Sequence, residues 1–247
     1  MNLLRADRST LSIDQWNLLS NLSHCYDDHA GLSVGEQYMS KQNSLPCKLR
    51  FKSPSLVHLF QVVPDAAQSL YRNNRDFLSL SADDRSTLLN GTLLYTAGMS
   101  SNFIFHKIRL TEHIAFYDAV EMMTSATTAS IGRRLSSRLY FDVFIMKLFL
   151  TILSFSTIRC TAFLNNTSDN LPNIKKILHI QDGYIELTWR YLLYKYDHEQ
   201  AVKCFSDFIR CIFIVNEGLV EAQKVQWFTD TMDSVTEKTE QSLILSE

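Results

Sequence analysis

Paired aspartates are the residues of this sequence that come closest to a catalytic pattern. Asp27-Asp28 and Asp83-Asp84 could hold Mg²⁺ through carboxylate oxygens, as diphosphate chemistry requires. Such a site needs several oxygens converging on one face, and the stretch from Asp83 to Thr87 lacks a third carboxylate. The dipole of a helix favours acidic residues in its first turn, so we expect Asp83-Asp84 to have that structural role.

Histidines and cysteines do not form a metal-binding pattern. His106 and His113 miss the i, i+4 spacing that places two imidazoles on one ion. The 5 cysteines include no C-x-x-C pair, and Cys204 and Cys211 fall two turns apart on one helix face, which suits buried packing. No nucleophile elbow, phosphate-binding loop or dinucleotide-binding pattern occurs. We therefore expect no metal, no cofactor and no enzymatic reaction.

The elements that would position any site are predicted to be helices. A chain of 247 residues with 46% hydrophobic content can bury one large core, so residues 1–247 are interpreted as a single domain. Only 7 Gly and 4 Pro interrupt it, too few for the many tight turns of a β-sandwich or barrel. The sequence therefore predicts an all-α fold.

Charge and hydropathy exclude two kinds of partner. A net charge of −2 gives no basic field for phosphate groups, so we expect no direct contact with nucleic acid. The apolar run over 141–158 is long enough to consider as a membrane span, but Asp142 and Lys147 interrupt it. We interpret this run as a buried core helix, with no membrane partner.

Local signals predict where the helices lie. Ser12 and Gln15 form a capping-box pattern that begins a helix ending near His29. Residues 30–53 lose helical periodicity and are predicted to be a long flexible connection. Pro64 should bend the helix that begins at Ser53. The other predicted elements are helices over 82–105, 138–157, 173–196 and 198–226, a short hairpin within 103–117, and a weak, detachable helix in the tail 227–247.

One ordered series of motifs resembles a known family. Phe77-x-x-Leu80-x-x-x-Asp84-Arg85-x-x-Leu88-Leu89 resembles the signature of nuclear-receptor ligand-binding domains, with Arg85 where that family usually has Gln. Further stretches are similar to the family's first, eighth, ninth and tenth helices and occur in the same order: 11–29, 142–156, 174–192 and 205–209. The same spacings also occur in the core of an ordinary amphipathic helical bundle.

The resemblance implies a fold and a ligand. The fold would be a three-layer antiparallel helical sandwich of about ten to twelve helices with a small β-hairpin, as in that family. Its lower half would enclose an apolar pocket for a small lipophilic molecule, and the protein would act in the nucleus as a transcription regulator. Positions that match pocket-facing sites by their distance from Phe77 are Leu56, Phe60, Val63, Leu94, Ala97 and Ser101.

The resemblance also implies protein partners. A coactivator or corepressor helix would lie in a groove at Arg72 and Leu88, and the terminal helix would close it through Glu247. Phe205, Phe208 and Ile212 match the family's dimer surface, for a second copy or another nuclear receptor, although they would also serve the core. The family's four-cysteine zinc modules for DNA binding are absent from this sequence.

Two other functions fit the same helices. In the first, aromatic side chains such as Phe60, Phe103, Phe105 and Phe116 fill the cavity, and the chain is a ligand-independent scaffold for protein partners. In the second, the chain is an isoprenoid-type all-α enzyme, which would need carboxylates converging in a cavity.

Overall fold

The computed structural model describes residues 11–25, 28–157 and 171–244, and these residues form helices joined by short turns. No strand occurs in the ranges described, so the all-α prediction is confirmed and the hairpin predicted within 103–117 is wrong. Lys107 ends one long helix, Arg109 turns the chain with a left-handed φ of 61°, and a single 3₁₀ turn leads into the next helix. The three-layer arrangement stays a prediction.

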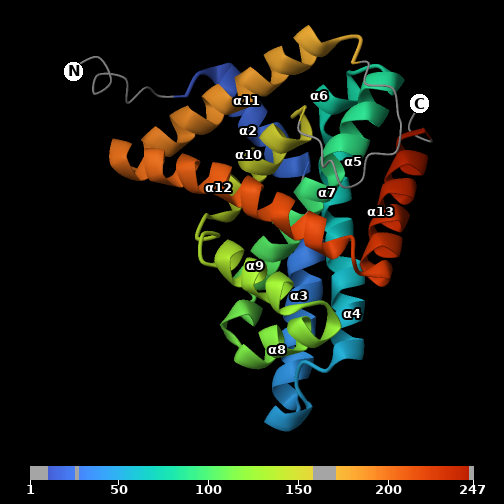
Figure 1. The fold of residues 1–247 in the computed structure, drawn as a ribbon. Coiled ribbons are helices and arrows are strands. Elements are labelled where there is room, and N and C mark those ends of the chain that lie inside the picture. Colours follow the sequence, from blue (N-terminus) through green and yellow to red (C-terminus); the bar gives the residue numbers. More distant parts are fainter. Residues whose placement is uncertain (1–10, 26–27, 158–170, 245–247) are drawn as a thin grey trace.

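The α-helices carry the labels of Figure 1. They are α2 (Ile13–Cys25), α3 (Asp28–Ser44), α4 (Ser53–Val62), α5 (Gln68–Asn73), α6 (Arg75–Leu78), α7 (Ala82–Lys107), α8 (Ile114–Met123), α9 (Ala126–Ser136), α10 (Val143–Ser154), α11 (Ile174–Lys195), α12 (His198–Ala222) and α13 (Gln226–Ile244). The 3₁₀ turns are η1 (Cys47–Leu49), η2 (Val63–Ala67) and η3 (Leu110–Glu112).

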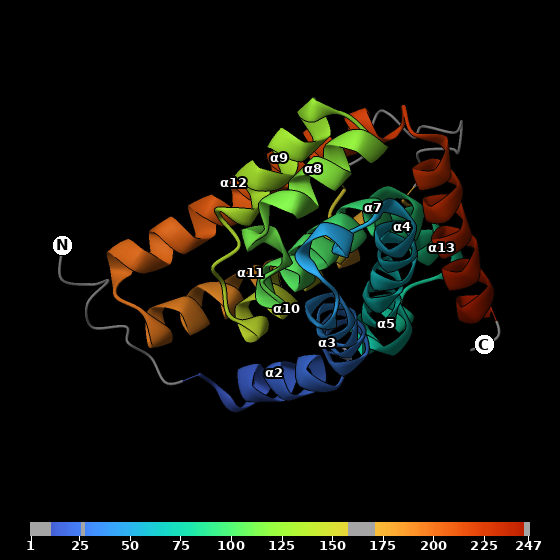
Figure 2. The same cartoon turned by 90° about the horizontal axis from the view of Figure 1, so that it is seen from below.

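Helix α7 is the central element of the domain. Ser81 caps it, because the Ser81 hydroxyl accepts a hydrogen bond from the backbone N–H of Asp84. Along its length α7 packs against η2, α3, α9, α10, α12 and α13. Figures 1 and 2 both place it in the interior, with the other helices around it.

Buried side chains form two clusters rather than one. The larger cluster centres on α7, α10, α11 and α12 and includes Phe77, Leu89 and Phe208. The smaller one joins α3, α4, the end of α7 and α8, and includes Leu56 and Phe116. Between them the clusters leave room for a cavity.

The flexible connection predicted over 30–53 is wrong for most of its length. Helix α3 covers 28–44, and it packs against η2, α4 and α7. Two glycines of this segment permit close packing: a Cβ on Gly31 would lie 2.7 Å from Cδ1 of Ile104, and one on Gly35 would lie 3.0 Å from Ile108. Glycine here removes a steric obstacle between helices and does not break the helix.

Two other local predictions are confirmed. Ser12 and Gln15 form the reciprocal capping box, with Ser12 N donating to Gln15 Oε1 at 3.0 Å and Gln15 N donating to Ser12 Oγ at 3.2 Å. Pro64 lies in η2, which separates α4 from α5. The interruption divides what would be one long helix into a part that carries Phe60 and a part that carries Arg72.

The terminal segment forms a helix that packs against the domain. Helix α13 extends over 226–244 and buries Met232, Val235 and Leu243 against the rest of the domain. It packs against α5 and α7, and Figures 1 and 2 show it along that side of the molecule. None of the helices described has the length and apolar character needed to cross a bilayer.

Candidate ligand cavity and helix groove

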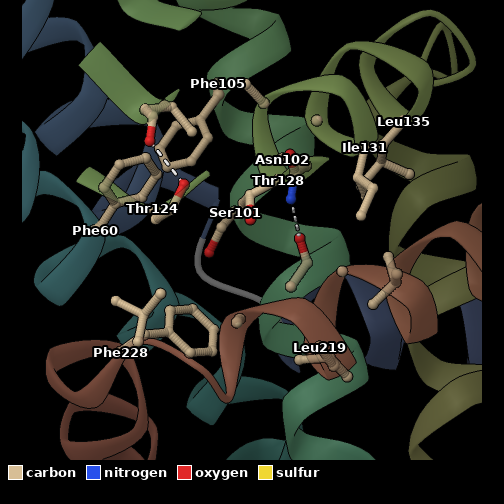
Figure 3. Close-up of a pocket in the computed structure, with 18 of the residues that line it drawn as sticks. Phe60, Ser101, Asn102, Phe105, Thr124, Thr128, Ile131, Leu135, Leu219 and Phe228 are labelled. Atoms are coloured by element: carbon tan, nitrogen blue, oxygen red, sulfur yellow. Dashed lines mark hydrogen bonds between the residues drawn. The ribbon is translucent and has the colours of Figure 1, made fainter. Parts of the chain in front are cut away.

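An apolar cavity lies where the two core clusters meet. Its volume is about 160 Å³, similar to an engineered cavity of roughly 150 Å³ that binds benzene. None of the described residues that line it carries a charge, so an ion inside would be costly. The walls come from α4, η2, α7, η3, α8, α9, α12, the turn that follows it and α13, and Figure 3 labels Phe60, Phe105, Thr128, Ile131, Leu135, Leu219 and Phe228 among them.

Half of the predicted pocket residues line this cavity. Phe60, Ala97 and Ser101 do so. Leu56, Val63 and Leu94 do not line it: they are buried, Leu56 and Val63 in the smaller core cluster and Leu94 in the larger one. Pocket walls and core interiors use the same apolar side chains, so distance from a motif does not separate them.

Ser101 is the polar feature of the cavity with an unmet hydrogen bond. Its side chain is 7% exposed, and its Oγ has no partner among the residues described. The neighbouring polar groups are engaged, since Asn102 Nδ2 donates to the Gly98 carbonyl at 2.8 Å and the Thr124 hydroxyl donates to the Val120 carbonyl at 2.7 Å. Figure 3 shows Ser101 on α7 directed toward the space beside Phe60 and Phe228. A buried hydroxyl without a partner is costly unless a ligand or water pairs with it.

Aromatic rings narrow one end of the cavity. The Phe60 ring centroid lies 5.3 Å from that of Phe105, 6.3 Å from Phe116 and 6.1 Å from Trp227. Phe103, which the filled-pocket alternative also named, is buried in the larger core cluster and does not line the cavity. The rings fill part of the interior and leave the space beside Ser101.

The sequence analysis missed the walls contributed by α8 and α9. Thr124, Thr128, Ile131 and Leu135 come from this region, to which no helix was assigned. A signal was present, because Ser125 precedes the amphipathic stretch 126–136 and its hydroxyl caps α9 by accepting the N–H of Thr128 at 3.1 Å.

The predicted groove at Arg72 is covered by the chain's own terminal helix. Arg72 Nε donates to Ser242 Oγ at 2.7 Å, and its Nη2 reaches the Lys238 carbonyl at 3.4 Å. On α7, Asn90 Nδ2 donates to Glu240 Oε1 at 2.8 Å. A cation near the last turns of a helix is favoured by the helix dipole, so Arg72 stabilises α13 where it lies.

The other two residues predicted for the groove are Leu88 and Glu247. Leu88 is 2% exposed and belongs to the larger core cluster, so it is a core residue and not a surface one. Glu247, predicted to close the groove, lies outside the described residues. Glu240, from the preceding turns, is the acidic residue that the structure places beside α7.

Family-signature residues all lie in the core or at a helix cap. Phe77, Leu80, Leu88 and Leu89 are buried. Asp84 is buried too, and it accepts hydrogen bonds from the Ser81 hydroxyl at 2.6 Å and from Asn173 Nδ2 at 2.7 Å. Burial by itself would raise the pKa of Asp84, but the hydrogen bonds from Ser81 and Asn173 bring that pKa below its usual value. The carboxylate fastens the start of α7 to the start of α11.

The predicted dimer residues on α12 face mainly inward. Phe208 is 1% exposed and belongs to the core, and Phe205 and Ile212 are partly buried against the same cluster. They face the neighbouring helices because every third or fourth residue of α12 lies on the side that packs against α7, α9 and α11. The exposed apolar residues of this helix are Val202, Ile209, Phe213 and Val220. Dimerisation stays a prediction.

Groups that could react or bind metal are few in the residues described. No three His, Cys, Asp or Glu side chains gather there as metal ligands would. Burial, reinforced by the nearby Asp207 carboxylate, raises the pKa of both Cys204 and Cys211 to about 12, so these thiols stay protonated and unreactive at neutral pH.

Two comparisons with known proteins found no match. No protein-family model matches the chain, and no curated protein matches it. Fold and site together define an all-α protein with an apolar cavity beside its terminal helix.

Proposed function

We propose that this chain is a nuclear-receptor-type ligand-binding domain, a switch that regulates transcription in the nucleus in response to a small lipophilic molecule. The observation that carries the proposal is the position of α13. Its first turns line the cavity through Trp227, Phe228 and Met232, whereas its last turns lie at Arg72 on α5. One helix therefore contacts both the apolar cavity and Arg72, where we propose that a partner helix binds.

The mechanism follows from this shared helix. A ligand that fills the space beside Trp227 adds contacts to α13 in its docked position and favours that position over a released one. Release of α13 would uncover Arg72 and the neighbouring surface of α7 for a coregulator helix of L-x-x-L-L type, which would receive the same cap from Arg72. The occupancy of the cavity thus biases which helix lies in the groove.

The first experiment is native mass spectrometry of the purified domain, followed by thermal unfolding with a panel of fatty acids and sterols. A ligand at 100 times its Kd adds about 2.7 kcal/mol of stability, which for a domain of this size raises Tm by several degrees. The variant Ser101→Leu, which fills the cavity, should abolish that increase. Ser130→Leu, which adds the same bulk on an exposed position of α9, should retain it.

A ligand-independent scaffold is the second candidate, and the aromatic rings around Phe60 favour it. It predicts that no small molecule co-purifies with the domain and that no lipophile raises its Tm. The lipophile panel would then leave the Tm of Ser101→Leu and of Ser130→Leu unchanged as well. The isoprenoid-type enzyme has less support, because the Asp84 carboxylate already accepts hydrogen bonds from Ser81 and Asn173.

A further inference from the structure

The turn between α3 and α4 is a projecting segment of the surface. Every residue from 43 to 49 is exposed, and none of the residues of η1 is buried. Figure 1 shows the end of α3 and this turn extending beyond α8 at the bottom of the view. Two large apolar side chains lie on the turn, Leu45 with 36% exposure and Leu49 with 54%. We call residues 41–52 the α3–α4 tip.

Positive charge is concentrated in the same segment. No Asp or Glu occurs between Glu36 and Asp65, whereas the α3–α4 tip contains Lys41, Lys48, Arg50 and Lys52. The chain as a whole has a net charge of −2, so the tip is opposite in sign to the average. The side chains of the three lysines are exposed, and within the residues described their ammonium groups have no ion pair or hydrogen bond. These cations are therefore available to an external anion.

The conformation of the α3–α4 tip is fixed at its base. The Arg50 guanidinium donates to the carbonyl oxygens of Asn43 at 3.1 Å and of Leu45 at 2.9 Å, which closes the end of α3. Phe51 is 3% exposed and has a left-handed φ of 55°, a strained conformation for a residue with a Cβ. Its backbone N–H donates to Gln42 Oε1 at 2.7 Å. Because these contacts order the turn in advance, a partner need not order it on binding.

Helix stability does not account for the lysine at position 52. Lys52 is the N-cap of α4, its side chain makes no capping hydrogen bond, and the first turn of α4 contains no acidic residue. A cation at the start of a helix is disfavoured by the helix dipole. The reason for this charge is therefore sought in a partner and not in the folded domain itself.

We propose that the α3–α4 tip docks the domain on an anionic phospholipid surface, with Leu45 and Leu49 among the headgroups and the lysines against the lipid phosphates. Exposed apolar side chains beside unpaired cations are typical of segments that lie on anionic membranes. The tip projects, and none of its residues lines the apolar cavity, so it suits a flat surface better than a peptide that requires a groove. Duplex DNA would match the charge and leave the leucines without a partner.

This mode of binding goes beyond the proposed function and differs from crossing the bilayer, for which none of the helices described is suited. The sequence analysis expected no membrane partner, but that expectation concerned the apolar run over 141–158. A docked tip uses a different segment and remains outside the hydrocarbon core.

The test is co-sedimentation of the domain with vesicles of phosphatidylcholine alone and with vesicles of equal parts phosphatidylcholine and phosphatidylserine. The unmodified domain should bind the mixed vesicles and not the neutral ones, and added salt should weaken the binding. Lys48→Gln/Lys52→Gln should bind the mixed vesicles about 25-fold more weakly, because each cation near an anionic membrane contributes about 1 kcal/mol, or fivefold. Leu49→Ser, which keeps the charge, should weaken binding several-fold through the loss of apolar contact.

Exposed residues on α11 and α12 provide the matched controls. Lys175→Gln/Lys203→Gln removes the same charge elsewhere, and Leu178→Ser changes a leucine that is 42% exposed. Both control variants should bind as the unmodified domain does, and melting curves should show every variant folded.

Equal weakening by the two lysine double variants, or equal binding by Leu49→Ser and the unmodified domain, overturns the inference. Absence of vesicle binding overturns it too, whether or not the domain binds duplex DNA or polyglutamate instead. Each of these results leaves the apolar cavity and the proposed function as they are, because no residue of the α3–α4 tip belongs to that cavity.

Discussion

The Phe208 ring on α12 lies parallel to the Phe149 ring on α10, with centroids 3.9 Å apart and an interplanar angle of 1°. Both side chains are fully buried, so this stack joins two long helices in the centre of the larger cluster. Phe208→Ala should lower the free energy of unfolding by about 3–5 kcal/mol, the usual cost of removing a buried phenyl ring. Denaturant unfolding measures it.

Phe213 on the same helix provides the control, since it is 70% exposed. Phe213→Ala should change stability by less than about 0.5 kcal/mol. A Phe208→Ala variant as stable as Phe213→Ala would mean that the two rings do not stack in the core.

Asp84 should contribute stability that depends on pH. Its pKa is lower in the folded domain than its ordinary 3.8, so the folded form holds the proton less readily than the unfolded chain. The contribution is therefore complete above pH 3.8 and is lost as the pH falls through the lower, folded-state pKa. Asp84→Asn should cost about 1–3 kcal/mol at pH 7, and the difference from the unmodified domain should shrink in acid.

The same variant separates a structural aspartate from a catalytic one. Urea unfolding at pH 7 and at pH 3 gives the stability difference, and titration with Mg²⁺ tests the enzyme alternative. Stabilisation by Mg²⁺ that disappears in Asp84→Asn would support a metal site and contradict the role in capping.

Arg72 should hold α13 in the groove. Arg72→Ala removes the bonds to Ser242 and Lys238, and we expect amide hydrogens of α13 to exchange several times faster, as a loss of about 1 kcal/mol implies. Hydrogen exchange followed by mass spectrometry resolves this helix from the others. Arg75→Ala, an exposed arginine on α6, should leave its exchange unchanged.

Two glycines should respond in opposite directions to alanine. Gly31→Ala places a methyl group 2.7 Å from Ile104 and 2.9 Å from Ala66, and should destabilise the domain by about 1–3 kcal/mol. Gly183 lies within α11, where an added methyl group would meet no atom within 4 Å, so Gly183→Ala should stabilise by about 0.5–1 kcal/mol. Equal melting temperatures for the two variants would contradict the close packing of α3.

Sequence reasoning identified the helices whose ends carry local signals. Ser12 acts through its hydroxyl on the backbone of the next turn, Pro64 acts through its ring, and the structure has a cap or an interruption at each. Gly31 and Gly35 lie in the segment 30–53, which was wrongly predicted to be a connection. They allow Ile104 and Ile108, at the C-terminal end of α7, to approach α3 closely. Local composition contains no information about that contact.

Three residues of the candidate cavity, Phe60, Ala97 and Ser101, were predicted from their distance to Phe77. Ala97 and Ser101 follow from the helix that carries Asp84, whereas Thr128 and Leu219 reach the same cavity from helices that only the tertiary fold brings there. The unmet hydrogen bond of Ser101 also needs coordinates, since a serine in a helix usually bonds to a carbonyl of the preceding turn.

The cavity beside Ser101 has a volumetric consequence. Unfolding eliminates internal voids, so the unfolded chain with its solvent occupies less volume than the folded domain, a difference on the order of tens of millilitres per mole. Hydrostatic pressure should therefore unfold the empty domain more readily than a close-packed one of equal size. A lipophile that occupies the 160 Å³ cavity removes part of that difference, so it should make the domain resistant to compression as well as to heat.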